Sequence, residues 1–395
     1  MPSFNFPFSV TLAVALSATA TLVLISRLVL TSTNSKTSRR TIASPRDTLL
    51  PYLSRSQALA LPYPPDLLPG ARDVDTPYGV MRVYEWGPEE GRKVVMVHGD
   101  TTPAPLWGPI GKALVERGCR VLVLDLWGRG YSDTPLNLPH DARLFAMQIF
   151  FALASSPLSW TGDASGGFSI IGFSLGGGIT VSFAARFPYL INSIILLAPA
   201  GILRSMPGDY ESIFFRFPSI FPSSYVRKMV GRVLGVDLET ARTNAKGTSP
   251  VEKQSPQESR SWKPQKPDVP AVVQWQFDNH QGFVHSFINT IQHGPIMHQQ
   301  SEWKILCDII KGESLGKAPG GGAPCKLHNS KILAIFGDAD AVVVEREVSK
   351  DLGQMLGGPD HVEFKTVPGS HGFPIPSSEE VVKHISDFWE LKVID

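Results

Sequence analysis

Ser174 is the residue of this chain whose type and setting best fit covalent chemistry. It is the centre of Gly172-Phe173-Ser174-Leu175-Gly176, which follows the apolar run FSII and precedes a helical pattern. A sharp strand-to-helix turn strains the serine backbone and leaves no room for side chains two positions away on either side, which explains both glycines. The helix N-terminus also favours developing negative charge. The motif therefore predicts a nucleophilic serine rather than a glycine-rich turn that contains serine by chance.

Serine is a weak nucleophile unless a base lies beside it. His371, in the turn 368–372 that follows a β run near the C-terminus, is placed to be that base. Its imidazole needs an orienting acid, which we expect to follow a strand and to precede the histidine in the chain. The run ILAIF is followed by Gly337-Asp338-Ala339-Asp340. Asp340 is the preferred acid and Asp338 is the alternative.

Acyl chemistry also needs two N–H donors for the oxyanion of the transition state. One is predicted to be the backbone N–H of Leu175, directly after the nucleophile. The other is predicted to be the N–H of Asp100, in the loop after the first buried strand. A carboxylate at that position would repel an oxyanion, so we expect the Asp100 side chain to point away from it.

The other noticeable polar residues fit structural roles. His98 is expected to hold its own loop, and Asp125, in DLWGRGYSD, to hold a turn near glycines and an arginine. The histidines of the central region lack an HExxH spacing and are expected to pack rather than to bind metal: His280, His285, His293 and His298. The three cysteines are far apart and form neither a disulfide framework nor a CxxC zinc pattern. We expect no metal and no organic cofactor.

The elements that must position these residues alternate between strands and helices. Near-continuous apolar runs predict strands buried on both faces, at 93–97, 120–124, 168–172, 193–197, 332–336 and 362–367. Helical patterns lie between them, for example at 111–118 and 177–187. An antiparallel hairpin or edge strands are expected around 78–86. The alternation predicts an α/β fold with a mostly parallel, doubly wound sheet.

The chain is predicted to divide into five parts. Residues 1–30 form a transmembrane or signal-anchor segment, and 31–70 form a Pro/Ser-rich tether with little secondary structure. Residues 71–200 are the first part of the catalytic core and 329–395 the second. Between them, residues 201–328 have few β runs and several aromatic-rich helical segments, which predicts a helical lid. Within the lid, the polar tract 246–270 predicts a disordered loop.

The N-terminal apolar run from Phe6 to Ser26 carries no charged residue. As a helix it would span roughly 30 Å, the thickness of the hydrocarbon core of a bilayer. Basic residues follow it, so a membrane anchor with the catalytic part in the cytosol is favoured. The alternatives are a signal peptide cleaved after Ala18-Thr19-Ala20, which would make the protein secreted, and a buried soluble helix.

Composition excludes one class of partner. The chain has 37 Lys and Arg residues against 36 Asp and Glu, which gives a net charge of +1. No basic stripe interleaved with aromatic residues is present either, so we expect no nucleic-acid partner. The apolar fraction of 43% is that of a globular protein.

Together the motifs resemble those of the α/β-hydrolase superfamily. HGDTTPAPLW resembles its oxyanion loop, DLWGRGYSD the turn after the next strand, and GFSLGG its nucleophile elbow. GDAD and PGSHGF resemble its acid and histidine loops. The order Ser174, Asp340, His371 is the order of that superfamily, whose usual spacing favours Asp340 over Asp338 as the acid. The pattern is similar to membrane-anchored monoacylglycerol lipase-like enzymes and to bacterial carbon–carbon bond hydrolases.

The resemblance implies a serine hydrolase that cleaves a carboxylic ester through a Ser-His-Asp acyl-enzyme mechanism. An anchor beside the bilayer and a lid rich in apolar residues favour a lipophilic, monoacylglycerol-like substrate. Hydrolysis of a carbon–carbon bond or a thioester by the same triad is one alternative. A non-catalytic protein that holds a small ligand on the same fold is another.

Overall fold

The computed structural model describes residues 40–162, 165–205, 212–238, 267–311 and 327–393. The predicted membrane segment at 1–30 lies outside these residues, and so does most of the predicted loop at 246–270. Among the described residues, no helix combines the length and apolar character needed to cross a bilayer.

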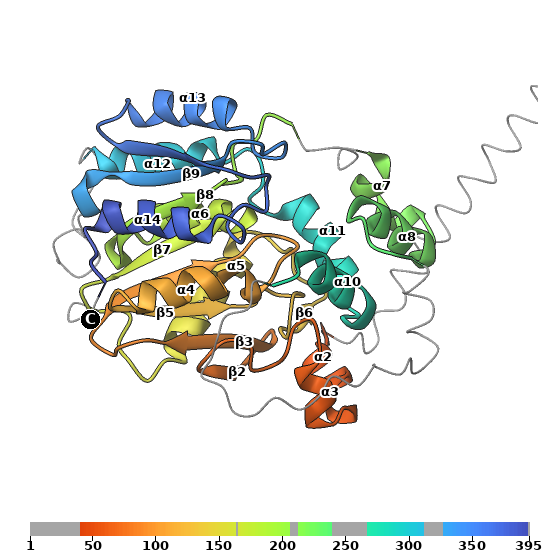
Figure 1. Cartoon of the computed structure of the whole chain (residues 1–395). Coiled ribbons are helices and arrows are strands. Elements are labelled where there is room, and N and C mark those ends of the chain that lie inside the picture. The colour runs from red at the N-terminus through yellow and green to blue at the C-terminus, as the bar shows by residue number, and fades with distance from the viewer. Residues whose placement is uncertain (1–39, 163–164, 206–211, 239–266, 312–326, 394–395) are drawn as a thin grey trace, which may run out of the picture.

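An eight-stranded sheet lies at the centre of the molecule, in the order β10-β9-β8-β7-β4-β5-β3-β2 (Figure 1). The antiparallel pairs are β2 with β3 and β3 with β5, and the other neighbours are parallel. The strands are β2 (Ala71–Thr76), β3 (Gly79–Trp86), β4 (Arg92–Val97), β5 (Cys119–Leu124), β7 (Phe168–Phe173), β8 (Ile191–Leu197), β9 (Ile332–Gly337) and β10 (Val362–Val367). The predicted strands are confirmed, with ends that differ by one or two residues, and the hairpin around 78–86 is β2–β3.

Helices cover both faces of the sheet, which explains why its inner strands β7, β8 and β9 are almost entirely apolar. The helices α4 (Gly108–Val115) and α14 (Ser378–Trp389) pack against each other in front of the sheet in Figure 1. Behind it, α6 (Leu175–Arg186) contacts both α5 (Ala142–Ala154) and α12 (Gln300–Ile310). The helix α13 (Glu345–Leu356) packs on α12 and β10. The mostly parallel, doubly wound sheet predicted from the alternation is thus present.

Residues 40–70 differ from the predicted tether. They contain β1 (Thr41–Ile42), α2 (Pro45–Thr48), η1 (Leu50–Tyr52) and α3 (Arg55–Leu59), and β1 pairs with β6 (Thr134–Pro135). Ser44 donates from its hydroxyl to the Tyr131 carbonyl at 2.8 Å. Tyr63 is completely buried and donates to Asp125 Oδ2 at 2.9 Å. The tether prediction is wrong for these residues, because the apolar side chains of this proline-rich segment belong to the core.

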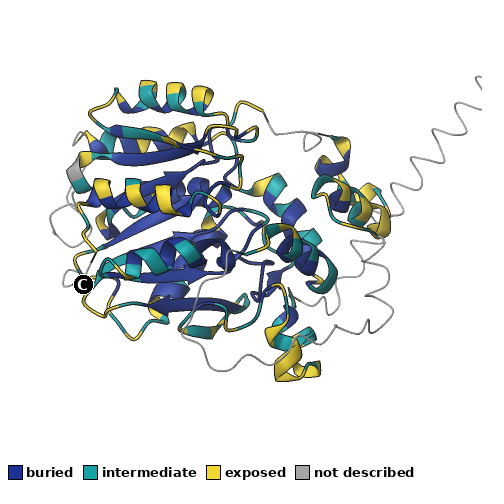
Figure 2. Ribbon diagram, in the orientation of Figure 1, coloured by how far each residue is buried: buried dark blue, intermediate teal, exposed yellow. Residues whose placement is uncertain are grey.

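A separate group of helices follows β8. It comprises α7 (Ile213–Arg216), η6 (Pro218–Ile220), α8 (Ser223–Val233), α10 (Val269–Asn279) and α11 (Phe283–His293). They share an apolar cluster of their own, made of Phe214, Phe215, Val230, Phe277, Phe283, Phe287 and Ile288. In Figure 2 the inner strands of the sheet are mostly dark blue, whereas α7 and α8 carry exposed residues over much of their surface. We call α7, η6, α8, α10 and α11 the helical insertion.

Two boundaries of the predicted lid need correction. The helix α12 lies within 201–328, but Trp303 and Leu306 belong to the main core and α12 packs on α6. Residues 269 and 270, placed in the predicted loop, are instead the first two residues of α10. Asp268 caps that helix by accepting the Ala271 N–H at 3.1 Å. The remaining short elements are η2 (Ala104–Trp107), η4 (Pro188–Leu190) and η7 (His328–Ser330).

Candidate active site

Ser174 lies in the tight turn between β7 and α6. Its φ of 53° and ψ of −119° are rare for a residue with a side chain, and such strain is found at functional sites. A Cβ on Gly172 would lie 2.3 Å from the Gly176 carbonyl oxygen, and a Cβ on Gly176 would lie 2.1 Å from that of Val97. Both glycines are therefore required for the turn, as the sequence predicts.

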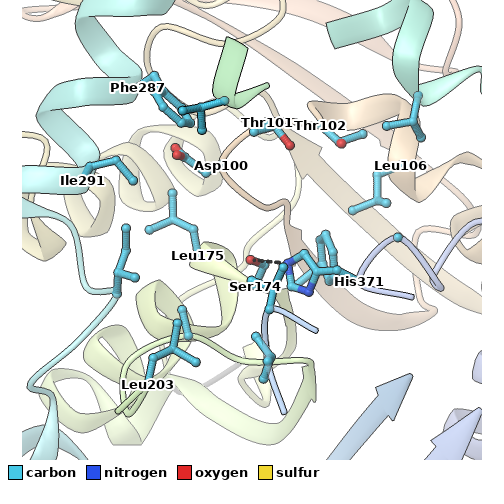
Figure 3. A pocket seen from close by; sticks show the side chains of 18 of the residues that line it. Asp100, Thr101, Thr102, Leu106, Ser174, Leu175, Leu203, Phe287, Ile291 and His371 are labelled. Atoms are coloured by element: carbon cyan, nitrogen blue, oxygen red, sulfur yellow. Dashed lines mark hydrogen bonds between the residues drawn. The ribbon is translucent and has the colours of Figure 1, made fainter. Parts of the chain in front are cut away.

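The side chains of Ser174, His371 and Asp340 form one hydrogen-bonded chain. His371 Nε2 lies 2.9 Å from Ser174 Oγ, the contact drawn in Figure 3, and His371 Nδ1 lies 2.8 Å from Asp340 Oδ2. The carboxylate accepts from Nδ1–H, which leaves Nε2 free to accept the serine proton. The structure thus brings together the three residues predicted for nucleophile, base and acid.

Asp340 and Asp338 have different surroundings. The Asp340 side chain is 0% exposed, and its second oxygen accepts the N–H groups of Val342 and Val343 at 2.8 and 2.9 Å. Asp338 is exposed and accepts the Gly369 N–H at 2.8 Å. It therefore holds the loop that carries the histidine, while Asp340 contacts the histidine itself.

The two predicted oxyanion donors lie beside the nucleophile. Leu175 is the first residue of α6, so its N–H has no partner within the helix. The loop that carries Asp100 is adjacent to Ser174: a Cβ on Gly99 would lie 3.3 Å from Ser174 Cβ and 3.1 Å from the Phe173 ring. Asp100, Ser174 and Leu175 line the same pocket.

The carboxylate of Asp100 pairs with Arg129, a partner that the sequence analysis did not identify. In Figure 3 its oxygens lie toward Phe287 and away from Ser174, as expected for a group that must not face an oxyanion. Arg129 Nη2 forms the ion pair with Asp100 Oδ1, and Arg129 Nε donates to the Asp100 carbonyl at 3.0 Å. Burial raises the pKa of the Asp100 carboxyl, and the charge of Arg129 opposes that rise. Arg129 lies 29 residues after Asp100 in the sequence, and no local pattern around it indicates this contact.

Arg129 also joins this loop to the helical insertion. The guanidinium is completely buried, donates to Thr290 Oγ1 at 3.0 Å and contacts Ser286 Oγ. Gln276 donates to the Thr101 carbonyl at 2.9 Å, from α10. The loop that carries Asp100, the predicted oxyanion loop, is therefore held by side chains of α10 and α11 as well as by the sheet.

The residues predicted to be structural have structural contacts. His98 accepts the Leu126 N–H at 2.9 Å, and Asp125 accepts the N–H groups of Ala104 and Tyr131, each at 2.9 Å. Burial lowers the pKa of His98 to about 3 and raises that of Asp125 to about 6. His280 is buried and contacts the Ser132 carbonyl at 2.9 Å. Within the part of the chain that the structure describes, no group of His, Cys, Asp and Glu side chains is arranged to hold a metal ion.

A pocket of about 620 Å³ opens beside Ser174 and His371. Its wall is mainly aliphatic and aromatic, and the sheet and the insertion both contribute to it. From the core come Leu106, Phe173, Leu175, Leu203 and Ile375, and from the insertion come Val233, Val269, Phe287 and Ile291. Pockets of this size and character accept small organic ligands with a few polar groups.

Residues 93–375 match the family model described as alpha/beta hydrolase fold. The chain belongs to the α/β-hydrolase family. The resemblance noted in the sequence is thereby confirmed, and the fold described above is the fold of that family.

Curated proteins are similar over part of the chain. A serine hydrolase-like protein of Dictyostelium discoideum is 31% identical over 33% of this chain and 35% of its own. The 2-hydroxy-6-oxo-2,4-heptadienoate hydrolase of Pseudomonas putida is 23% identical over 33% of this chain and 45% of its own. The chain spans half or less of the length of these curated relatives.

A membrane phospholipase A of known structure has the same fold over nearly the whole chain. It superposes with a TM-score of 0.54 at 16% identity and covers 97% of each chain. At this identity the similarity concerns the fold alone.

Proposed function

We propose that this α/β hydrolase cleaves a carboxylic ester with a lipophilic acyl group, such as a monoacylglycerol, through a covalent acyl-serine intermediate. The observation that carries the proposal is the continuous chain Ser174–His371–Asp340, with both contacts at 2.8–2.9 Å, on the wall of a largely apolar pocket. A nucleophile, a base within hydrogen-bond distance and an acid that orients the base are the parts that acyl transfer requires.

In the proposed mechanism, His371 Nε2 accepts the Ser174 proton as Oγ attacks the substrate carbonyl. Asp340 keeps the proton on Nδ1 and stabilises the imidazolium. The N–H groups of Leu175 and Asp100 stabilise the oxyanion, each worth about 3–4 kcal/mol of barrier. His371 then protonates the leaving alcohol, and the same steps with water release the acid.

The apolar pocket wall supports a lipophilic acyl group. Burying each methylene of an acyl chain against such a wall contributes about 0.8 kcal/mol. Two further polar side chains of the pocket, Thr101 and Thr102, lie beside Asp100 on the same loop (Figure 3). This arrangement suits a substrate with a polar ester at one end and an apolar chain at the other.

A carbon–carbon bond or thioester hydrolase with the same triad is the second candidate. The observation that favours it is the similarity to the P. putida hydrolase, although it covers one third of the chain. The lining of the pocket favours the ester, since among the described residues Asp100 is its one acidic side chain and no Lys or Arg lines it.

A fluorophosphonate probe tests the nucleophile directly. Wild type is compared with Ser174→Ala, His371→Ala and, as a control, Ser301→Ala, which removes an exposed hydroxyl of α12. Labelling should be lost in the first variant, much reduced in the second and unchanged in the control. Equal labelling of all four, or none of wild type, would contradict the hydrolase mechanism and favour a ligand-binding protein. Turnover of matched ester, thioester and vinylogous diketone substrates then decides the bond that is cleaved.

We further propose that residues 6–26 anchor the enzyme in a membrane with its catalytic part in the cytosol. The uncharged run and the basic residues after it support this orientation. Resistance to alkaline extraction, together with protease access to the catalytic part from the cytosolic side, is expected. Release of a shortened protein into the medium would instead indicate a cleaved signal peptide.

A further inference from the structure

The part of the insertion from Ile213 to Tyr225 carries an unusual concentration of exposed apolar side chains. Ile213 is 66% exposed, Phe217 46% and Tyr225 45%, and Ile220 in the same stretch is 42% exposed. Soluble surfaces carry such residues singly, whereas a group of them marks a surface that binds something apolar. The exposed ring of Tyr225 packs on the buried Phe214 and the half-buried Phe221, with ring centroids 6.0 and 5.6 Å away, which fixes α8 against α7.

The same region is positively charged in a chain that is otherwise nearly neutral. Between Glu211 and Asp237 the sequence contains four basic residues and no Asp or Glu. Arg227 faces inward and donates to the Phe277 carbonyl, so Arg216, Lys228 and Arg232 carry the exposed charge. Tyr225, Lys228 and Arg232 follow one another at spacings of three and four, so they share one face of α8. All three are exposed. Val226, Val230 and Val233 occupy the opposite face.

We propose that α7, η6 and α8 form a surface that docks onto a negatively charged lipid bilayer. Exposed aromatic and aliphatic residues beside basic ones are the composition of interfacial helices, which insert their apolar side chains at the level of the headgroups. Each basic residue near an anionic surface contributes roughly fivefold to the binding constant. We assign a lipid as the partner because exposed apolar residues and basic residues occur together. An interface with an ordinary protein surface requires no such excess of positive charge.

The inner face of α8 connects this surface to the pocket. Val233 lines the cavity beside Ser174, one helical turn from Val230 in the apolar cluster. The outer face of the same helix presents Lys228 and Arg232. Docking therefore places one wall of the active-site pocket against the bilayer, independently of any anchor at the N-terminus.

The test uses the full chain with a fluorophore attached at single cysteines. Cys119 and Cys307 are buried, so Cys325→Ser gives a suitable background. Tyr225→Cys and Phe217→Cys report on the proposed surface, and Tyr189→Cys, at a site with a similar exposed fraction of 43%, is the control. Vesicles of phosphatidylcholine with and without phosphatidylserine carry a doxyl-lipid quencher. We expect at least twofold stronger quenching at 225 and 217 than at 189, and an increase with phosphatidylserine.

Charge reversal sharpens the result. Lys228→Glu with Arg232→Glu should bring the quenching at 225 down to the value at 189, whereas Arg346→Glu with Lys350→Glu, a pair of the same spacing on α13, should leave it unchanged. Equal quenching at all three sites would overturn the proposal. So would self-association through this surface, seen as a change in sedimentation caused by Tyr225→Glu without lipid. Hydrolysis of a soluble short-chain ester by the same variants reports separately on the proposed catalytic function.

Discussion

The two sides of the active-site pocket are built in different ways. On the sheet side, Ser174 and the oxyanion loop are fixed by the backbone: strand ends, a residue with positive φ, and glycines that allow no Cβ. On the other side, the helical insertion has its own apolar cluster and meets the sheet domain through side chains such as Gln276, Ser286 and Thr290. The turn at Ser174 thus depends on backbone geometry, whereas the position of the Asp100 loop and the shape of the pocket also depend on side chains of the insertion.

The largest effect on kcat is expected at one of two neighbouring carboxylates on the sheet side, Asp340 and Asp338. Asp340→Asn should lower kcat by about 10⁴, because the amide favours the wrong imidazole tautomer. Asp338→Asn should leave kcat within a few-fold of wild type, since the amide oxygen can still accept the Gly369 N–H. Steady-state kinetics of both variants on one soluble ester gives the comparison. Similar losses in the two variants would contradict the assignment of Asp340.

The second-largest effect, on the free energy of unfolding and on kcat, is expected at Arg129, which lies where the sheet domain meets the insertion. Arg129→Met leaves the Asp100 carboxylate buried without its counter-ion, and removing one partner of such a pair costs about 3–5 kcal/mol. The free energy of unfolding in urea should fall accordingly, and kcat should fall with it because the oxyanion loop loses its support. The double variant with Asp100→Asn should recover part of the stability. A single variant as stable as wild type would show that the pair does not join the two regions.

A smaller change in the free energy of unfolding is expected when the pH is lowered, because of His280, which lies where the insertion meets the sheet domain. Burial lowers the pKa of His280 to about 4, so the folded protein holds a neutral imidazole where the unfolded chain holds a charged one. The unfolded state binds more protons between pH 6.5 and 4, and stability is therefore lost as the pH falls through that window. At pH 5 this amounts to about 2 kcal/mol for His280.

Urea unfolding at pH 7 and pH 5 tests this prediction. His280→Gln should show a smaller loss of stability between the two values than wild type, by about 2 kcal/mol. Asp125, whose pKa is raised by burial, acts in the opposite direction but equally in both proteins. An unchanged pH dependence would mean that His280 is not the neutral, buried group described above.

The smallest effect should come from the insertion side alone. Val233→Phe adds volume to the pocket wall and should lower kcat/KM for a long-chain ester about tenfold, in line with the modest worth of methylene-sized changes in apolar pockets. Acetyl esters should be unaffected. Val344→Phe, at an exposed position outside the pocket, is the control. A loss that is equal for short and long chains would place the effect on the catalytic side instead.

The same contrast explains how far the sequence alone could predict the molecule. The strands of the sheet and the turn around Ser174 follow from local patterns, because apolar runs and glycine positions record backbone constraints directly. The choice of His371 over nine other histidines rested on its turn near the C-terminus, and the structure places it 2.9 Å from the serine. Its partner Asp340 follows a strand that could be recognised in the same way.

The interactions that the sequence did not reveal are those between distant side chains. Nothing local distinguishes Arg129 as the partner of Asp100, since the two residues belong to different loops. The packing of Tyr63 against Asp125 was hidden for a similar reason, because a proline-rich segment has the composition of a linker whether or not its few apolar side chains reach the core. Likewise, α12 has an ordinary amphipathic pattern, and only its contact with α6 separates it from the insertion.

The separation of 197 residues between Ser174 and His371 has a consequence for the biosynthesis of the enzyme. The proposed base follows the proposed nucleophile by that distance, so a growing polypeptide that already contains Ser174, the Asp100 loop and the whole insertion still lacks its proposed proton acceptor. Each newly made molecule therefore becomes active only after β10 and the turn that follows it have left the ribosome and joined the edge of the sheet. Until then the nascent enzyme can meet its substrate without consuming it.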